Sequence, residues 1–268
     1  MLEAWWWFFA GMNLPLSPRI RATGAPPIPA VRGWAARYQG GAGPVLDLTQ
    51  AVPGYPPHPD LLARLAAAAG DAKAAGYGPI EGETALREAL AADMVRAYGG
   101  RLDAADIAIT AGGNLAFTLS MMTLAGSGEA VMLPAPWYFN HRMALEALGI
   151  PCRVLPCRAE DGFLPDPALA ASLMEGVRAI VLVTPNNPTG ATYSPELIAQ
   201  FAKLCWDRGA WLVLDETYRD FIPEAAGAPH GLFQDAAWRD HVVHLYSFSK
   251  AYCVPGHRIG AIAAGAGF

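Results

Sequence analysis

Short apolar segments alternate with helical patterns along most of this chain, and the alternation limits the folds it can adopt. Strands that alternate with helices favour an α/β architecture with a doubly wound, mostly parallel sheet. Seven apolar segments of strand length are predicted at 107–110, 130–133, 152–155, 179–183, 211–214, 242–246 and 259–263. Helices are predicted at 60–69 and 82–98, and crossover helices at 115–125, 141–148, 166–175 and 195–208.

The residues before this pattern are rich in proline and glycine. Residues 13–57 predict an arm with one short helix near 29–38, followed by a loop. The apolar run Trp5-Trp6-Trp7-Phe8-Phe9 is too short to span a bilayer and has no basic flank before it, so residues 1–11 are interpreted as an upstream extension before an alternative start at Met12. We expect an N-terminal extension and arm over 1–45 and one main domain over 46–268.

Composition narrows the class of ligand and the compartment. The 268 residues are 53% hydrophobic, which is ample for a buried core, and the net charge of −5 comes without blocks of Lys or Arg. This argues against a nucleic-acid surface or a membrane patch and favours a small-molecule ligand. Four cysteines without a C-x-x-C pair indicate a reducing, cytoplasmic location.

The segment S-F-S-K at 247–250 follows the sixth predicted strand. Ligands of open α/β sheets bind at the carboxyl ends of the strands, where Lys250 would lie. A lysine amine with a lowered pKa can condense with a carbonyl, and Ser247 and Arg258 are candidate phosphate ligands. Together they suggest a phosphorylated carbonyl compound, whereas Lys250 alone would be typical of a solvated surface lysine.

Asp215 follows the fifth predicted strand, at the start of Asp215-Glu216-Thr217-Tyr218. A carboxylate leaving a buried strand needs a partner, and a cation such as a protonated ring nitrogen would serve. The alternative is that Asp215 caps the next helix.

Two further turns follow predicted strands. Gly112, Gly113 and Asn114 open a helix whose free N–H groups and dipole favour a phosphate, although a tight turn needs glycine for steric reasons alone. The turn T-P-N-N-P-T-G at 184–190 holds the Asn187 amide at the sheet edge between rigid prolines, although it is also compatible with an ordinary Asx/Pro turn.

Aromatic residues and histidines complete the candidates. Trp137, Tyr138 and His141 lie in a cluster after the second strand that offers a flat face for a planar ring, although core packing is the default for such residues. The glycine-rich loop at 77–82 carries Tyr77 before a helix. No metal site is predicted: His241 and His244 are three apart in a strand and point to opposite faces, so core or edge positions are expected.

Together, these motifs resemble the class I/II aminotransferases among the fold-type I pyridoxal-phosphate enzymes, from about Leu46 to Gly260. The order and spacing of the motifs, including Gly82-x-x-x-Leu86-Arg87, are specific to that family. The resemblance implies the large domain of a pyridoxal-phosphate-dependent transferase, with a seven-stranded, mostly parallel sheet between helices. It also implies the cofactor pyridoxal 5′-phosphate.

The resemblance assigns roles to the residues singled out above. Lys250 would form the Schiff base and shuttle the proton, while Asp215, supported by His141, would pair with the pyridinium nitrogen. Asn187 and Tyr218 would hydrogen-bond the ring oxygen, and Tyr138 would stack on the ring, with Trp137 as the alternative. The phosphate would be held by Gly113, Asn114, Ser247, Arg258 and, across a homodimer interface, Tyr77. The catalytic set would be Lys250, Asp215 and Tyr218.

The implied reaction is the transfer of an amino group between an amino acid and a 2-oxo acid, in two half-reactions through the Lys250 Schiff base. Nucleic acid and membrane are not expected as partners. Ala51 stands where many members carry glycine on the substrate side, so the shape of the substrate stays open.

The family normally continues beyond this point, with a C-terminal small domain and the arginine that binds the substrate carboxylate. We therefore expect a chain truncated at its C-terminal end, whose activity alone is an open question. Another chemistry on the same fold, such as a β-lyase or a cyclopropane-forming synthase, would share nearly all of these residues. A regulatory cofactor-binding module is disfavoured, because the segment before Leu46 is short and proline-rich and the net charge is negative.

Overall fold

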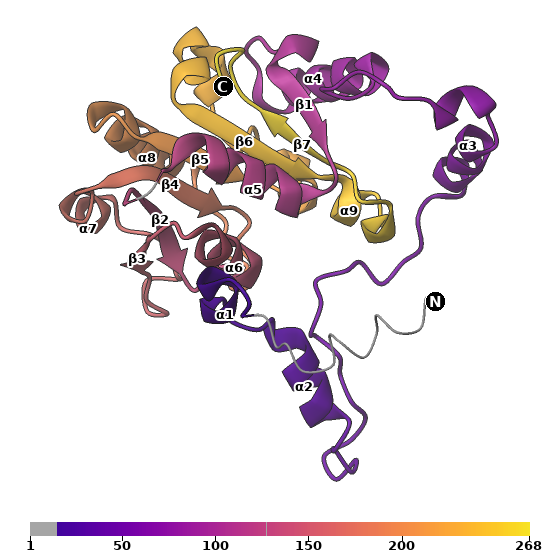
Figure 1. Cartoon of the computed structure of the whole chain (residues 1–268), viewed down its shortest axis with the longest axis horizontal. Helices are drawn as coiled ribbons and strands as arrows, with labels where there is room; N and C mark the ends of the chain where they lie inside the picture. Colours follow the sequence, from indigo (N-terminus) through magenta and orange to yellow (C-terminus); the bar gives the residue numbers. More distant parts are fainter. Residues whose placement is uncertain (1–14, 127) are drawn as a thin grey trace, which may run out of the picture.

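A seven-stranded sheet forms the centre of the computed structural model, which describes residues 15–126 and 128–268 (Figure 1). The strand order is β1-β7-β6-β5-β4-β2-β3. The strands are β1 (Ile107–Thr110), β2 (Ala130–Ala135), β3 (Cys152–Pro156), β4 (Val177–Val183), β5 (Trp211–Asp215), β6 (Val242–Ser247) and β7 (Gly260–Ala263). The seven predicted strands and the α/β class are confirmed, with bounds shifted by one or two residues in most cases.

Strand direction changes at one side of the sheet. The neighbouring pairs from β3 to β6 are parallel, whereas β7 is antiparallel to both β1 and β6. The chain returns from β6 to β7 through the short helix α9 (Phe248–Ala251) and the turn η8 (Pro255–His257). No long crossover helix lies between β6 and β7, so β7 runs back along β6.

Helices cover both faces of the sheet. The helices of the body are α4 (Thr84–Tyr98), α5 (Gly113–Leu124), α6 (Phe139–Leu148), α7 (Pro167–Ser172) and α8 (Pro195–Asp207). The core of one face takes its helical residues from α4, α7 and α8, and the core of the other from α5 and α6. Strand β4 feeds both, because Ile180 and Leu182 belong to the first core and Ala179 and Val181 to the second, which is the period of two expected of a buried parallel strand.

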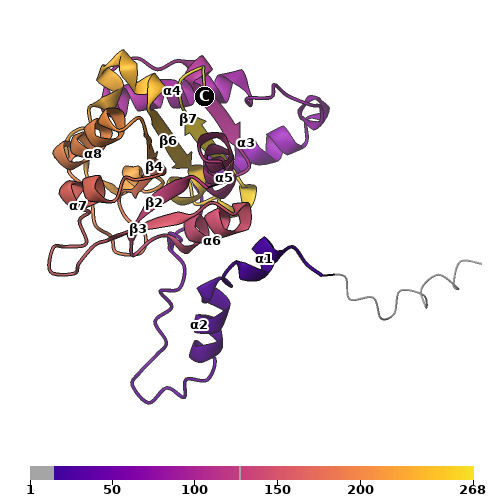
Figure 2. The ribbon, with the colours of Figure 1, turned by 60° about the vertical axis from the view of Figure 1, so that its left-hand side comes forward.

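The N-terminal part extends away from this body as an arm. Its helices are α1 (Pro18–Ala22), α2 (Pro27–Ala35) and α3 (Pro59–Ala69), and none of them has a buried residue. Helix α1 rests on α6, because Arg19 donates to the carbonyl of Leu148 at 3.1 Å and the Gly24 amide donates to Glu146 at 2.9 Å. Beyond that anchor, α2 projects from the body in both views (Figures 1 and 2). The expected upstream extension at residues 1–11 lies outside the described residues.

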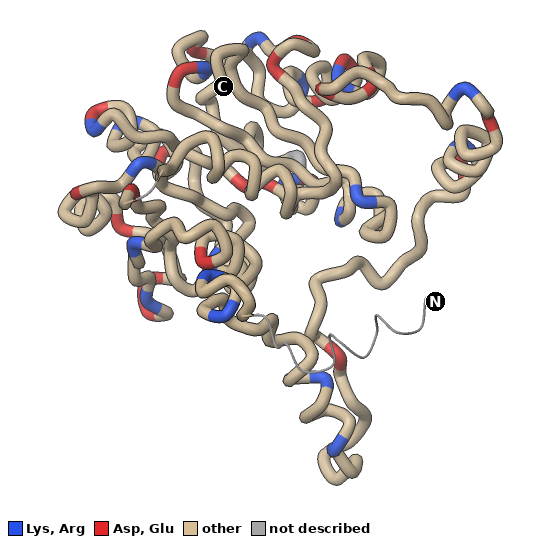
Figure 3. The backbone as a smooth tube through the Cα atoms, in the orientation of Figure 1, with Lys and Arg blue, Asp and Glu red and all other residues tan. Residues whose placement is uncertain are grey.

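The remaining elements are short. They are the 3₁₀ helices η2 (Ala72–Ala75), η3 (Ala104–Asp106), η4 (Arg219–Phe221), η5 (Glu224–Ala226), η6 (Leu232–Gln234) and η7 (Ala236–Asp240). Basic and acidic residues are interspersed over the described chain, without a concentration of basic residues on one face (Figure 3). Among the described helices, none combines the length and the hydropathy needed to cross a membrane.

Candidate active site

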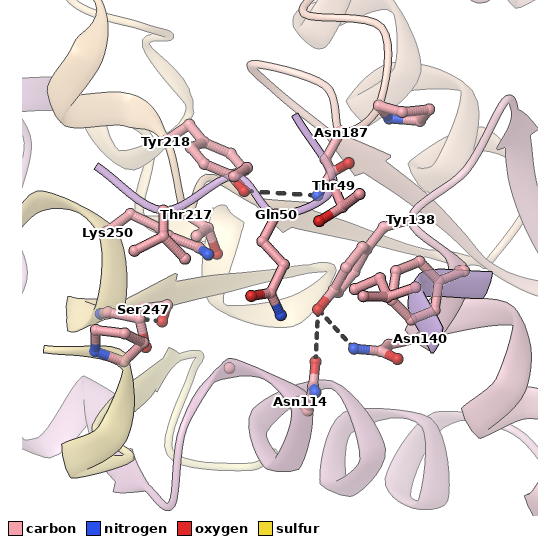
Figure 4. Close-up of a pocket in the computed structure, with 18 of the residues that line it drawn as sticks. Thr49, Gln50, Asn114, Tyr138, Asn140, Asn187, Thr217, Tyr218, Ser247 and Lys250 are labelled. Atoms are coloured by element: carbon pink, nitrogen blue, oxygen red, sulfur yellow. Dashed lines mark hydrogen bonds between the residues drawn. The ribbon is translucent and has the colours of Figure 1, made fainter. Parts of the chain in front are cut away.

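A pocket of about 960 Å³ opens at the carboxyl ends of β4, β5 and β6. It meets the first turn of α5 on one side and segment 46–52 on another (Figure 4). The strands end side by side, so side chains from Val183, Asp215 and Ser247 reach one space although they are far apart in sequence. This convergence is the one expected for an open α/β sheet.

Asp215 lies at the floor of the pocket as a buried carboxylate. Its Oδ2 is 3.1 Å from Nε2 of His141, and its Oδ1 accepts hydrogen bonds from the Thr217 amide at 3.1 Å and the Thr217 hydroxyl at 2.6 Å. Burial by itself would raise the pKa of Asp215, but the hydrogen bond and charge of His141, followed by the two hydrogen bonds from Thr217, leave that pKa below its usual value. Asp215 is therefore a buried carboxylate anion that can pair with a cationic group of a ligand.

Lys250 stands on α9, directly after β6. Its amine is half-buried, and burial, followed by the nearby charge of Arg258, lowers the pKa of Lys250. The helix α9 begins where it does because the Ser247 side chain caps it, accepting a hydrogen bond from the Ser249 amide at 3.3 Å. The structure thus presents an amine that is more easily freed of its proton than a solvated lysine, which disfavours the surface-lysine interpretation.

Glycines bring backbone and cation together at the other end of the pocket. Gly112 has φ +87°, and a Cβ there would lie 2.2 Å from Nη2 of Arg258. A Cβ on Gly260 would lie 2.5 Å from the Gly112 carbonyl carbon. Only glycine at both positions lets the start of α5 approach the Arg258 guanidinium this closely, so one end of the pocket combines a helix N-terminus with a fixed positive charge.

A set of hydrogen-bonding groups lies between these two ends. Asn187 donates to the hydroxyl of Tyr218 at 3.5 Å. Burial, followed by the charges of Tyr138 and Asp215, raises the pKa of Tyr218 to about 12, so the phenol keeps its proton at neutral pH. The amide of Asn140 donates to the Tyr138 hydroxyl at 2.6 Å, and that hydroxyl donates to Asn114 at 3.4 Å (Figure 4).

The structure decides between the two candidate aromatics. Tyr138 lines the pocket, and its ring meets that of His141 edge-on at 5.1 Å. Trp137 instead packs against the core between the sheet and helices α5 and α6, beneath Arg142. Tyr138 is therefore the aromatic that can contact a ligand.

Ten of the eleven predicted site residues meet at this site. Nine line the pocket: Gly113, Asn114, Tyr138, Asn187, Asp215, Tyr218, Ser247, Lys250 and Arg258. His141 lies behind Asp215. The exception is Tyr77, whose side chain is fully exposed at 110% and lies outside the pocket of its own chain.

Several pocket residues escaped the sequence analysis. Thr49 and Gln50 enter from the loop before α3, and Asn140, Thr217 and Ser249 flank residues that the motifs did identify. Thr217 had a local signal, since Ser and Thr two residues after Asp commonly bond its carboxylate. Gln50 had none, because nothing in a loop sequence says which distant surface the loop will cross.

A second buried polar group lies next to the pocket, on the other side of β5. The carboxylate of Glu216 accepts a hydrogen bond from the Tyr98 hydroxyl at 2.6 Å and lies 2.9 Å from Nε2 of His244. His230 contacts the same carboxylate oxygen at 3.3 Å. His244 is thus a core histidine, as expected, while the half-buried His241 packs against Trp206. No group of three or more His, Cys, Asp or Glu side chains suited to a metal occurs in residues 15–126 and 128–268.

Comparison with known proteins shows what the chain is similar to. The model of the family described as aminotransferase class I and II matches residues 44–266. The aromatic aminotransferase ISS1 of Arabidopsis thaliana is 32% identical over 253 residues, covering 92% of this chain and 61% of the relative. The valine–pyruvate aminotransferase of Mycobacterium tuberculosis is 31% identical, covering 88% and 61%.

The solved structures agree with this fold. The aspartate aminotransferase of Thermus thermophilus with maleate superposes with a TM-score of 0.82 at 26% identity, over 95% of this chain and 65% of that one. The chain therefore spans somewhat less than two thirds of the length of these relatives.

Proposed function

The chain belongs to the class I and II aminotransferase family, and we propose that it moves an amino group between an amino acid and a 2-oxo acid by means of the pocket described above. One observation carries the proposal. The buried anion Asp215, the cation Arg258 and the amine of Lys250 all line one pocket. This charge arrangement fits a ring with a basic nitrogen at one end and a phosphate at the other.

The cofactor of this family is pyridoxal 5′-phosphate, and the residues present fit it. Arg258, Ser247 and the first turn of α5 at Gly113 and Asn114 would hold the phosphate, since a helix N-terminus and a guanidinium both favour it. Asp215 would pair with the ring nitrogen. The group of Asn187, Tyr218 and Tyr138 would bond the ring oxygen and cover the ring face.

The cofactor supplies an electron sink for the charge that develops at the substrate α-carbon. Lys250 would be both the attachment point for the cofactor aldehyde and the base that carries the α-proton on its Nζ, because its lowered pKa favours the free amine. Asp215, whose lowered pKa keeps it ionised, would pair with the ring nitrogen and favour its protonated form.

Several features of the whole protein belong to the same proposal. We infer a homodimer in which Tyr77 reaches the phosphate of the partner chain, a role supported by its full exposure next to the exposed Ile80. We also retain the proposed division into an arm over 1–45 and a cofactor-binding domain over 46–268. The four cysteines are all free, which supports the proposed cytoplasmic location.

The test separates cofactor attachment from turnover, because the chain is shorter than its relatives. Wild-type chain and Lys250→Ala are mixed with pyridoxal phosphate, their visible absorbance is recorded, and borohydride-treated samples are mapped by peptide mass. The proposal requires a visible band and a pyridoxyl label on Lys250 in the wild type alone. Equal behaviour of the two proteins would rule out the lysine assignment.

Turnover is then measured as 2-oxo-acid-dependent amino transfer, with release of ammonia and pyruvate followed in parallel. Amino transfer supports the proposed reaction. Release of ammonia without a 2-oxo acid would instead indicate lyase chemistry on the same residues.

A further inference from the structure

We propose that Gln50 is a specificity-determining residue, which selects substrates whose side chain has an apolar stem and ends in an oxygen acceptor. The inference rests on the proposed function, because it concerns the substrate side of the same pocket. Ala51 left the shape of the substrate open in the sequence, and the residue before it now supplies a specific chemical preference.

Gln50 lines the pocket from an exposed position, although it belongs to neither the sheet nor a helix. Segment 46–52 crosses the pocket, and the Gln50 carboxamide occupies the centre of Figure 4, with Lys250 and Ser247 to one side and Tyr138 and Asn114 to the other. A molecule that reacts at Lys250 would therefore extend past this carboxamide.

A hydrogen bond fixes which end of the carboxamide faces a ligand. Arg32 on α2 donates from Nη2 to Oε1 of Gln50 at 2.9 Å. With its oxygen engaged by a guanidinium, the carboxamide has its NH₂ group left to offer, and an NH₂ group can only donate. The pocket thus presents a directed donor at this point.

Hydrogen bonds within segment 46–52 hold the backbone just before Gln50. Asp47 accepts hydrogen bonds from the Thr49 amide at 2.9 Å and from the Thr49 hydroxyl at 2.6 Å, which closes a tight turn just before Gln50. Hydrogen bonds from Thr49, followed more weakly by the charge of Arg32, lower the pKa of Asp47. Asp47 therefore stays ionised and keeps accepting the two hydrogen bonds from Thr49 that hold this turn.

Apolar residues make up much of the pocket lining on the side of Gln50. Pro27, Ile28 and Val31 on α2 and Leu48 and Val52 on the same segment line this side of the pocket. A directed donor among apolar lining residues determines orientation and specificity more than it determines total affinity. A side chain with an apolar stem and a terminal carbonyl, hydroxyl or carboxylate oxygen matches both features.

The test uses two unreactive probes that differ in one group. Isoheptanoate ends in an isopropyl group, and γ-acetylbutyrate has the same shape but ends in a methyl ketone, which accepts hydrogen bonds and cannot donate them. Their dissociation constants are measured by calorimetry on the cofactor-loaded chain, whose cofactor content is determined independently by absorbance. One net hydrogen bond corresponds to a preference for the ketone of about tenfold.

Three variants make the result specific. Gln50→Met keeps the length of the side chain but removes the donor, so the preference for the ketone should fall to about one. Arg32→Met frees the carboxamide to rotate and should reduce the preference. Arg37→Met removes an exposed arginine shortly after α2 and should leave the preference unchanged.

The possible failures are distinguishable. A chain that takes up cofactor but binds both probes equally well, or keeps its preference in Gln50→Met, overturns the role of Gln50 and leaves the proposed function intact. A chain that takes up no cofactor overturns the proposed function and the inference with it.

Discussion

The imidazole of His141 and the carboxylate of Asp215 lie 3.1 Å apart, one on α6 and the other at the end of β5. His141 is itself enclosed, because it is 2% exposed and its ring stacks on Phe117 at 3.9 Å. His141 thus holds the carboxylate of Asp215 in a position set by the packing around both residues.

Replacing His141 with Ala should weaken cofactor binding about tenfold, because it removes one charge-assisted hydrogen bond from a buried carboxylate. The pKa of Asp215 should rise at the same time, since His141 is the leading cause that lowers it. Cofactor titration by absorbance measures the first effect. His58→Ala, at an exposed histidine of the arm, should change nothing, and unaltered affinity in His141→Ala would contradict the role assigned to the pair.

Removing the charge at Arg258 should shift the titration of Lys250. Burial and then the Arg258 charge lower the pKa of Lys250, so Arg258→Ala should raise it toward the ordinary value, and Arg258→Lys should preserve it. The pH dependence of Lys250 modification by trinitrobenzenesulfonate, followed by peptide mapping without cofactor, tests this. A midpoint that moves to lower pH in Arg258→Ala would have the wrong sign.

Gly112→Ala should have two effects: it should strain the backbone, and it should also impair phosphate binding. Gly112 and Gly128 share φ +87°, but a Cβ at Gly112 would meet Arg258 at 2.2 Å, whereas at Gly128 nothing lies within 4 Å. Both substitutions should therefore lose about 1 kcal/mol of stability from the left-handed backbone. Only Gly112→Ala should also weaken pyridoxal phosphate binding. Equal cofactor affinities in the two variants would argue against phosphate binding between the start of α5 and Arg258.

The buried Glu216 cluster should make the fold sensitive to acid. Burial lowers the pKa of His244 below 6.5. Burial would raise the pKa of Glu216, but the charge and hydrogen bond of His230, followed by those of His244, bring it well below 4.5. Both groups bind fewer protons when folded, so the free energy of unfolding should fall as pH drops below about 6.5 and fall further below about 4.5.

Denaturant unfolding as a function of pH tests this cluster directly. Glu216→Gln should lose about 3 kcal/mol near neutral pH, because it leaves buried partners without their anion, and its loss of stability below pH 4.5 should be smaller. Glu88→Gln, at an exposed site on α4, should follow the wild-type profile. A wild-type stability that does not change between neutral and acidic pH would exclude the cluster as a source of acid sensitivity.

The local sequence pattern predicted the strands and most of the candidate residues that line the pocket, and one physical reason explains why. Parallel strands place their carboxyl ends at a common edge, so residues such as Asp215, Asn187 and Lys250 converge once the strands are identified. The reversal of β7 was harder to predict, because an apolar segment of strand length carries no sign of its direction. It follows instead from the short link through α9.

The features that the sequence did not predict depend on contacts between residues far apart in the chain. Gln50 and Arg32 meet only because the chain returns from α2 past the pocket, and no local propensity encodes that path. The Glu216 cluster draws on α4, β6 and His230 in the loop before η6, and its Tyr98–Glu216 bond joins residues more than a hundred positions apart.

The pocket has walls of two origins, since Asp215 ends strand β5 and Lys250 directly follows strand β6, while Gln50 belongs to segment 46–52 outside the sheet. Substitutions in segment 46–52 do not disturb the hydrophobic core, because most residues of this segment are exposed. A substitution in this segment can therefore change the lining of the pocket while the strand that positions Asp215 stays the same.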